Sequence, residues 1–355
     1  IHAGVSEGEL DEDKLGKKVK RIADKTQYKT ARKGDLVFNM MRAWQGAIGV
    51  VRSDGLVSPA YIVAKPNEKI WPEYMDYCMK TPRMIHAIHR QSYGVTDFRL
   101  RLYWDSFTPI TCQLPTLPEQ QKIAAILSTQ DKVIELKEKL LAQKQQQKKY
   151  LMQQLLTGKK RLPGFDRKWN YVKANEIFKS IVDKSHDGKL EVLSSTQDKG
   201  IVPRSQVDID IKYNENSLST YKKVCEGDFV ISLRSFQGGI EYSNYAGIVS
   251  PAYTVLRAIV KIDNGYYKQF FKSSNYIKRL NVAVYGIRDG KQISYDDFGQ
   301  IKIPVPPIEE QREVAKVLST ADHEIDLLQK SIEAEKQKKK ALMQLLLTGK
   351  VRVKI

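Results

Sequence analysis

The sequence is poor in the residues that build disulfide frameworks and metal sites. It has only three cysteines and five histidines among 355 residues. Cys78, Cys112 and Cys225 lie far apart without a C-x-x-C spacing, so they predict neither a zinc site nor a disulfide framework and are typical of a reducing cytoplasm. His86 and His89 stand three residues apart but lack a nearby cysteine or acidic third ligand, so we expect no metal site there.

Long hydrophobic runs and cofactor motifs are missing as well. No stretch is apolar enough to predict a membrane span, and the N-terminus lacks the basic-then-apolar pattern of a signal peptide. No G-x-x-x-x-G-K-[ST] loop for ATP phosphates occurs. The Pro-rich stretch 304–307 lacks the Asn or Asp of an amino-methyltransferase motif. These absences predict a cytoplasmic chain that has no catalytic centre and no cofactor of its own.

Positive charge, by contrast, is abundant. The chain has 59 Lys and Arg against 41 Asp and Glu, a formal net charge of +18. Basic residues exceed acidic ones in both segments that we expect to be globular, residues 1–117 and 159–304. A field of this sign suits a polyanion such as nucleic acid, although simple solubility charge is the alternative.

The chain repeats once, at an offset of 191 to 193 residues. The first copy reads GDLV from Gly34, RAWQG from Arg42 and GLVSPAY from Gly55. The second copy reads GDFV from Gly227, RSFQG from Arg234 and GIVSPAY from Gly247. Each copy leads through a Pro-rich stretch into a helical segment, so the order is domain, helix, domain, helix. The first copy has fewer residues before its Gly-Asp than the second and no match to Trp169, so we expect the first domain to be N-terminally incomplete.

Both helical segments carry apolar residues on an approximate heptad, with Lys, Gln and Glu between them. The stripe of the first comprises Ile123, Leu127, Ile134, Leu141, Leu151 and Leu155, and that of the second comprises Val314, Leu318, Ile325, Leu328, Ile332, Leu342 and Leu346. Proline stands at each start, and Leu-Thr-Gly-Lys closes each end at Gly158 and Gly349. We expect each stripe to be buried against the other helix.

Connectivity predicts how the helices pair. About 40 residues at 1.5 Å each make a helix of roughly 60 Å. The link 159–164 is too short to return along such a length, so the second helix must run back antiparallel to the first. We therefore predict two globular domains on an approximate two-fold axis, an arrangement that suits duplex DNA.

The globular segments mix short β-branched or aromatic runs with helical stretches, which predicts α+β domains. We expect strands at 35–39, 48–52, 60–64, 228–233 and 253–258, and helices at 72–90 and 266–281. The predicted organisation is a first domain at 1–117, a central helix at 118–158, a second domain at 159–304, a C-terminal helix at 305–349 and a tail at 350–355.

A turn after one strand of each copy holds side chains that suit base recognition. Arginine can bind guanine O6 and N7, glutamine can pair with adenine, and an aromatic ring can pack on sugars or thymine methyls. The candidates are Arg42, Trp44 and Gln45 in the first copy, and Arg234, Phe236 and Gln237 in the second. The alternative for the two aromatic residues is that they are core anchors.

A second loop repeats its frame while its side chains differ. Thr96 of the first copy becomes Arg288, and Arg99 becomes Lys291. Two domains that read different bases from one scaffold would show this, and so would neutral drift. The candidate DNA-binding residues here are Tyr93, Thr96, Arg99 and Arg101 in the first copy, and Tyr285, Arg288, Lys291 and Gln292 in the second.

The tandem layout, the LPEQQ motif from Leu117, the IEEQ motif from Ile308 and both Leu-Leu-Thr-Gly-Lys ends resemble the specificity subunit of type I restriction-modification systems over nearly the whole chain. The resemblance implies two target-recognition domains that each read half of a split, asymmetric site in double-stranded DNA. It also implies helices that hold two methyltransferase subunits, with Lys132 and Lys137 as probes of that surface, and restriction or translocase subunits in the same complex. Methyl donor and ATP are then expected on the partner subunits.

Three alternatives differ in function class. The chain could be a complete methyltransferase or nuclease, which the missing cofactor motifs oppose, or a noncatalytic coiled-coil scaffold without DNA, which two basic domains oppose. It could also be the specificity half of a different DNA-modifying complex. Methylation by the chain alone would indicate the enzyme, and salt-dependent DNA binding would exclude the scaffold.

Overall fold

The computed structural model of the chain describes residues 2–4, 8–10, 25–96, 99–207, 215–283 and 293–355. The chain divides into two compact units, residues 1–139 with 329–355, and residues 140–328. Two helices of 39 residues each, α4 (Leu117–Leu155) and α9 (Ile308–Leu346), contribute a part to each unit.

The globular part of the first unit is a small α+β fold. An antiparallel sheet has the order β5-β4-β7, and β3 pairs with β6 beside it. The strands and 3-10 turns are β1 (His2–Gly4), β2 (Gly8–Leu10), η2 (Lys25–Gln27), β3 (Lys29–Ala31), β4 (Leu36–Asn39), η3 (Ala43–Gln45), β5 (Ile48–Val50), β6 (Gly55–Val57) and β7 (Tyr61–Ala64). The helices are α1 (Pro72–Met79), α2 (Pro82–Gln91) and α3 (Trp104–Phe107).

The globular part of the second unit repeats this plan with more strands. Its largest sheet has the order β14-β13-β16-β9, and β12-β15, β10-β11 and β17-β8 form antiparallel pairs. The strands are β8 (Asn170–Lys173), β9 (Phe178–Ile181), β10 (Leu193–Thr196), β11 (Gly200–Pro203), β12 (Lys222–Val224), β13 (Phe229–Ile231), β14 (Glu241–Tyr242), β15 (Gly247–Val249), β16 (Thr254–Ala258) and β17 (Lys302–Val305). The helices and 3-10 turns are η4 (Ala174–Glu176), η5 (Arg204–Gln206), η6 (Glu215–Thr220), α5 (Ser235–Gly238), α6 (Asn264–Phe271), α7 (Ser274–Ala283) and α8 (Tyr295–Gln300).

Strand periodicity explains how each sheet separates two cores. Successive side chains of a strand point to opposite faces. In β4, Leu36 and Phe38 join the core under α1 and α2, whereas Val37 faces a smaller cluster with the β3-β6 pair. In β13, Phe229 and Ile231 face α6 and α7, and Val230 faces the β12-β15 side. The five predicted strands therefore form, each within two residues of its expected start and end.

Each of the two predicted helices within the globular parts is instead a pair of helices. Pro82 lacks an N–H and disfavours helical backbone at Thr81, so α1 ends and the Thr81 hydroxyl caps α2 by accepting from the Met84 N–H. In the second unit, the Ser273 hydroxyl accepts from the Tyr276 N–H, and α7 begins there. The single helices expected at 72–90 and 266–281 were therefore wrong in their continuity.

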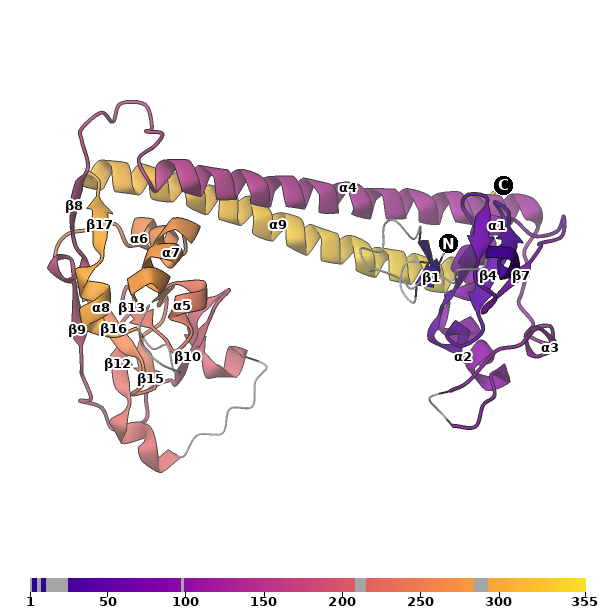
Figure 1. Cartoon of the computed structure of the whole chain (residues 1–355), viewed down its shortest axis with the longest axis horizontal. Coiled ribbons are helices and arrows are strands. Elements are labelled where there is room, and N and C mark those ends of the chain that lie inside the picture. Colours follow the sequence, from indigo (N-terminus) through magenta and orange to yellow (C-terminus); the bar gives the residue numbers. More distant parts are fainter. Residues whose placement is uncertain (1, 5–7, 11–24, 97–98, 208–214, 284–292) are drawn as a thin grey trace. The chain divides into compact units, whose positions relative to one another are not determined.

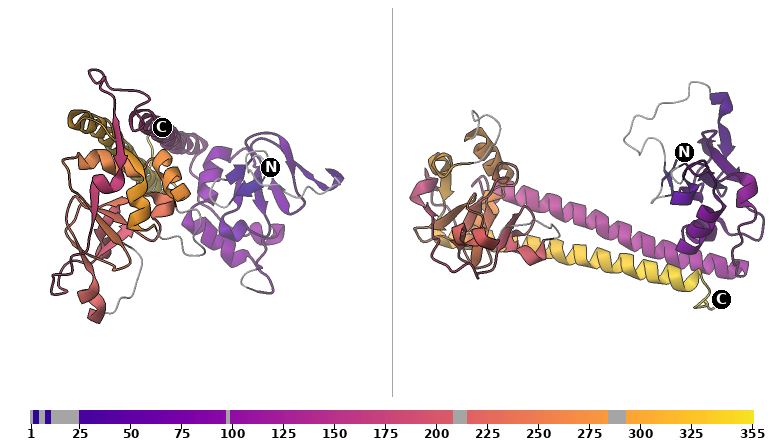
Figure 2. Two further views of the ribbon diagram at one scale, coloured as in Figure 1. Left: turned by 60° about the vertical axis from the view of Figure 1, so that its left-hand side comes forward. Right: turned by 90° about the horizontal axis from the view of Figure 1, so that it is seen from below.

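In each unit, α4 and α9 lie side by side and run antiparallel (Figures 1 and 2). In the first unit, Lys137 Nζ lies 2.8 Å from Glu335 and Lys339 Nζ lies 2.5 Å from Asp131. In the second unit, Lys144 Nζ lies 2.7 Å from Glu324, and Lys148 pairs with Asp322. Rising residue numbers in α4 thus meet falling numbers in α9, which confirms the antiparallel prediction, and ion pairs cross the polar middle of α4.

The ends of the apolar stripes belong to the globular cores as well as to the helix pair. Ile123 and Leu127 are buried with the first domain, and Val314 and Leu318 with the second. The expectation that each stripe packs only on the other helix was therefore incomplete. Gly158 and Gly349 both have φ of 69°, the left-handed conformation that ends a helix readily with glycine. No helix within the described residues is long and apolar enough to cross a membrane.

Candidate nucleic-acid interface

The turn between β4 and β5 presents two of its three predicted residues to solvent. Arg42 and Gln45 are exposed at either end of η3. Trp44 is half-buried, because its indole N–H donates to the Met41 carbonyl at 3.0 Å and its ring meets His89 edge-on at 5.7 Å. Trp44 therefore anchors the turn on α2, and Arg42 and Gln45 are left to reach a ligand.

The second predicted loop of the first unit lies beside this turn. Tyr93 and Arg101 exchange backbone hydrogen bonds of 3.1 and 2.9 Å at the base of the loop. The next residue, Leu102, donates to the Met40 carbonyl at 2.8 Å, while the Met40 N–H donates to Ala60 at 3.0 Å. Met40 thus joins the Arg42 turn, the Ser58–Tyr61 turn and the loop that carries Thr96, Arg99 and Arg101, all three of which are exposed.

Tyr93 is exposed over 59% of its surface, although its ring packs on Tyr103 with centroids 5.2 Å apart. Gly94 follows it at a place where a side chain would collide with backbone, since an added Cβ would lie 2.2 Å from the Arg99 carbonyl oxygen. The loop of the first unit therefore requires glycine at this position.

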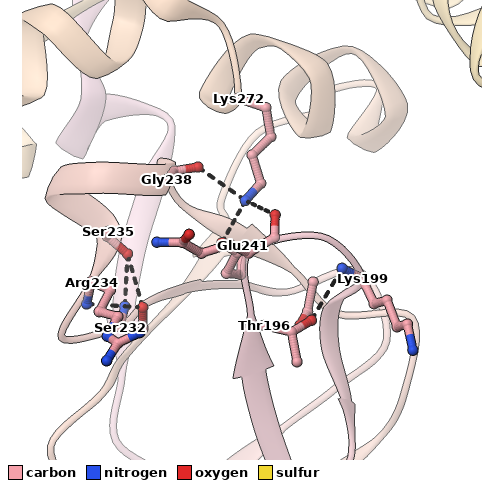
Figure 3. A network of polar contacts seen from close by, with 10 residues as sticks. Thr196, Lys199, Ser232, Arg234, Ser235, Gly238, Glu241 and Lys272 are labelled. Carbon is pink, nitrogen blue, oxygen red and sulfur yellow. Dashed lines mark hydrogen bonds and ion pairs between the residues drawn. The ribbon is translucent and has the colours of Figure 1, made fainter. Parts of the chain in front are cut away.

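In the second unit, Arg234 and Gln237 are exposed on either side of Ser235, at the start and middle of α5. The buried Ser235 hydroxyl accepts from the Ser232 N–H at 2.8 Å and fixes the turn (Figure 3). The side chain of Phe236 lies outside the described residues, as do the other predicted residues of this copy, namely Tyr285, Arg288, Lys291 and Gln292.

The repeated Gly-Asp and Ser-Pro-Ala-Tyr motifs have structural roles. Asp35 accepts from the Arg32 N–H, and Asp228 accepts from the Cys225 N–H, both at 2.8 Å. Lys29 donates to the Tyr61 carbonyl at 2.7 Å, and Lys222 donates to the Tyr253 carbonyl at 2.6 Å. Burial, and then the nearby charge of Lys184, lower the pKa of Lys222. Both lysines hold the turn next to the predicted reading residues; Lys222 is half-buried, and Lys29 is exposed apart from this contact.

Arg204 is a cationic residue of the second unit that the sequence did not single out. Its side chain is half-buried, and its Nε donates to the Ser194 hydroxyl at 3.3 Å. Burial raises the pKa of Tyr253, and the charges of Arg204 and Arg234 oppose that rise. Arg204 starts η5 directly after β11. Its position gives no motif in the sequence, because only the pairing of β10 with β11 brings it to Ser194.

The LPEQQ motif at the start of α4 and the IEEQ motif at the start of α9 attach each helix to a globular part by hydrogen bonds. The Gln120 side chain accepts from the Trp71 N–H at 2.8 Å and donates to the Pro115 carbonyl at 2.9 Å. Gln311 does the same with Asp263 and Pro306, at 2.9 and 2.8 Å. The glutamates before them are buried and paired with arginines, Glu119 with Arg352 and Glu310 with Arg161.

Trp169, which has no match in the first copy, belongs to one of these junctions. Its indole N–H donates to Glu310 at 2.8 Å, and the Arg161 guanidinium lies 5.2 Å from its ring centroid. An added Cβ on Gly158 would lie 3.2 Å from the ring, so the end of α4 packs closely on it.

The two lysines chosen as probes of a partner surface differ in position. Lys132 is 60% exposed and contacts only the neighbouring Glu135 among the ion pairs of the described residues, at 3.4 Å. Lys137 donates to Ser331 and Glu335 of α9, both at 2.8 Å. Lys137 is therefore part of the helix seam, so a charge reversal there would disturb helix pairing and could not report on a partner by itself.

His86 and His89 are both exposed on α2, and within the described residues no group of three or more His, Cys, Asp or Glu gathers as a metal site. The exposed cationic residues of the candidate interface are Arg42, Arg99 and Arg101 in the first unit and Arg234 in the second. Cationic, partly aromatic loops on a rigid sheet can contact phosphates and base edges.

Known proteins share this architecture. A type I restriction enzyme specificity subunit, MjaVIII of Methanocaldococcus jannaschii, is 27% identical over 329 residues, which cover 84% of this chain and 75% of that protein. The solved HsdS subunit of Thermoanaerobacter tengcongensis has a TM-score of 0.51 at 22% identity and covers 90% of this chain and 82% of its own. A structure described as "Structural basis underlying complex assembly and conformational transition of the type I R-M system" has a TM-score of 0.57 at 20% identity and covers 92% and 84%.

The family described as "Type I restriction modification DNA specificity domain" matches residues 12–145 and again residues 166–336. The two matches correspond to the two copies of the repeat and together cover most of the chain. The chain therefore belongs to the family of type I restriction-modification DNA specificity subunits.

Proposed function

We propose that each globular part reads one half of a split, asymmetric site in double-stranded DNA. The first half is read by the Arg42 turn with the Tyr93–Arg101 loop, and the second by the Arg234 turn. One observation carries this proposal: the bonds that build the turns repeat between the units, and each turn leaves an arginine and a glutamine exposed. The asymmetry of the site rests on the loop at 93–101, whose Thr96 and Arg99 are replaced by Arg288 and Lys291 in the second copy. Asp35 and Lys29 have direct counterparts in Asp228 and Lys222.

The positive net charge of the chain supports a polyanionic ligand, and the exposed arginine and glutamine side chains support base reading. Exposed arginines can neutralise phosphates and fork onto guanine, and exposed glutamines can pair with adenine. The net charge of +18 gives a long-range attraction to DNA. The chain acts as a recognition subunit in the cytoplasm, and methyl donor and ATP bind to its partners.

One face of α4 supports docking of a methyltransferase subunit. Leu136, Leu140 and Tyr150 are 53%, 43% and 54% exposed. At 3.6 residues per turn they lie with Lys132 on one face, turned away from the residues that meet α9. In the first unit, a cleft of about 850 Å³ between α1 and α4 adjoins this face and is lined by Trp71, Tyr77, Ala124, Lys132 and other residues.

The complex contains two such methyltransferase subunits, and restriction or translocase subunits join the same assembly. The likeness to a structure concerned with complex assembly of a type I system supports this arrangement. The double variant Leu136→Glu/Leu140→Glu should reduce co-purification of the methyltransferase subunit at least tenfold, as loss of a hot spot does. Val182→Glu, which places the same charge on an exposed apolar residue outside the helices, should leave co-purification intact.

Base reading is tested with the assembled methyltransferase complex on a library of randomised DNA. Arg42→Ala should relax base preference in one half of the site, and Arg234→Ala in the other half. Lys65→Ala and Lys261→Ala remove exposed charges outside the turns and should leave base preference unchanged. If both arginine variants keep the full preference of the parent, the proposed reading turns are wrong.

A further inference from the structure

We propose that the turn between β10 and β11, residues 197–199, is a second base-reading loop of the second unit and forms one continuous reading edge with the Arg234 turn. This inference rests on the proposed function and extends it to residues that no repeated motif marks. Lys272 and Glu241 act as positioning residues that join the two loops.

The hairpin that carries this turn is held firmly from below. Leu193, Ile201 and Val202 are buried. Gly200 has φ of 77°, and an added Cβ would lie 2.6 Å from the Tyr242 carbonyl oxygen, so the hairpin lies directly on β14. Ile201 also forms a parallel bridge with Ser243. A rigid support of this kind positions a loop for specific contacts.

The tip of the hairpin is exposed and internally ordered. Gln197, Asp198 and Lys199 are all exposed. The Thr196 hydroxyl accepts from the Lys199 N–H at 3.1 Å (Figure 3). It also donates to the Gly200 carbonyl at 2.9 Å. The turn therefore presents an amide and an ammonium group in a fixed frame, and neither is needed for the core.

The tip touches the Arg234 turn. The place of a Cβ on Gly238 lies 3.0 to 3.2 Å from Cγ, Cδ and Nε2 of Gln197, so the glutamine side chain lies across the end of α5. A larger residue than glycine at position 238 would push Gln197 away. Arg234, Gln237 and Gln197 consequently occupy one surface.

An ion pair between the half-buried Lys272 and the buried Glu241 joins the two loops. Lys272 Nζ donates to the Gln197 carbonyl at 3.2 Å and to the Gly238 carbonyl at 3.0 Å (Figure 3). The same nitrogen lies 2.5 Å from Glu241, whose side chain is 2% exposed. Burial raises the pKa of Glu241, and Lys272 opposes that rise. Because the Lys272 ammonium group already contacts Gln197, Gly238 and Glu241, its role is to position the loops and not to bind DNA.

The repeat extends to this hairpin and supports a reading role for its tip. Counted back by 192 residues, the pairing of Thr196 with Gly200 falls on the pairing of Gly4 with Gly8 in β1 and β2. The three residues between the strands are Gln197, Asp198 and Lys199 in one copy and Val5, Ser6 and Glu7 in the other. The strand pairing is thus common to both copies, while the sequence between the paired strands differs, as it does between residues 93–101 and residues 285–292.

The chemistry of the tip assigns different roles to its residues. Gln197 has the donor and acceptor needed to pair with adenine N6 and N7. Lys199 carries a point charge suited to a phosphate. The two roles predict different outcomes, because a base contact changes sequence preference whereas a phosphate contact changes affinity for all sequences equally.

The test uses the assembled complex with its methyltransferase subunits on DNA randomised in one half-site at a time. Gln197→Ala should lower discrimination about tenfold at one position of the half read by the second unit and leave the other half unchanged. Lys199→Ala should weaken binding to all sequences and reduce the log-log salt slope by about one. Lys189→Ala, which removes an 86% exposed lysine elsewhere in the same unit, should leave base preference unchanged.

Lys272→Met tests the positioning role and should relax the same half-site as Gln197→Ala and Arg234→Ala, while Lys272→Arg should restore the preference. Thermal unfolding of each variant shows that the second unit remains folded. If Arg234→Ala relaxes one half-site and Gln197→Ala does not, the hairpin tip is not a reading loop and the proposed function stands. If neither variant changes base preference, the proposed function itself fails for the second unit.

Discussion

Arg352 forms a two-pronged ion pair with Glu119, which lies 233 residues earlier in the chain. Its Nε and Nη2 donate to the two carboxylate oxygens, each at 2.5 Å. Arg161 makes the same contact with Glu310, at 2.5 and 2.6 Å. Each arginine follows the end of one long helix, and each glutamate stands at the start of the other. The two copies of the repeat therefore share this ion pair, which joins the end of one long helix to the start of the other.

We predict that these ion pairs stabilise the helix ends. Arg161→Ala should lower the free energy of unfolding by about 2 kcal/mol, because Glu310 is fully buried and loses its charged partner, although the partial exposure of Arg161 reduces the cost below that of a fully buried pair. Arg352→Ala should act in the same direction. Urea denaturation measures both. Lys336→Ala, which removes a half-exposed pair with Glu138, should have little effect.

The Glu119 pair also predicts a dependence on pH. The hydrogen bond from Arg352 is the main cause of a lowered pKa for Glu119. A lowered folded-state pKa means that the stabilisation is fully present above the unfolded value near 4.5 and is lost as the pH falls through the lower value. The stability difference between the parent and Arg352→Ala should therefore be full at pH 7 and decrease below about pH 4.5. A difference that grows on acidification would contradict this assignment.

DNA affinity of the assembled complex should fall steeply with salt, because Lys and Arg release counterions when they neutralise phosphates. Six phosphate contacts would lower affinity roughly a thousandfold between about 50 and 200 mM salt. Fluorescence anisotropy with a labelled duplex measures this. A nearly flat response over that range would argue against an electrostatic DNA interface.

Much of the fold could be predicted because its signals are local. The tandem repeat, the heptad stripes and the glycines at helix ends are read directly from short stretches of sequence, and the structure confirms long helices at Leu117–Leu155 and Ile308–Leu346. Strand pairs such as β8 with β17 could not be predicted, since residues 170–173 meet residues 302–305 only after the intervening domain has folded. The match of β1-β2 to β10-β11 was missed because the backbone pairing repeats and the side chains do not.

The candidate site could be predicted in outline only. Short motifs located Arg42, Arg234 and the loops that carry them, but burial decides which neighbours remain available. Trp44 contacts the Met41 carbonyl and the His89 ring, and Lys137 contacts Glu335 of α9. No sequence pattern predicts either contact. Gln197 was missed because the β10-β11 hairpin brings it to the Arg234 turn from 37 residues away in the sequence. Distant residues gathered by a sheet have no fixed spacing from which to recognise them.

The helix pair predicts a way to alter the recognised site without altering the bases read. One helical turn is inserted into α4 near Gln146, with a matching turn in α9 near His323, which adds about 5.4 Å. The insertions fall between the ion pairs of Lys144 with Glu324 and of Lys148 with Asp322, so that both pairs can still form. The gap between the half-sites should widen by one or two base pairs, and both half-sequences should stay the same. Methylation mapping on a library with variable gaps detects the change. Altered half-sequences with an unchanged gap would contradict a spacer role for the helices.

The most direct test of two independent readers is a domain exchange followed by methylation mapping in cells that express the chain with its partner subunits. Residues 162–304 are replaced by the corresponding segment of another specificity subunit, and the modified sites are read across the genome. We predict a split site in which one half changes to that of the donor domain and the other half is identical to that of the parent. A continuous site, or a change in both halves together, would contradict the two-reader account.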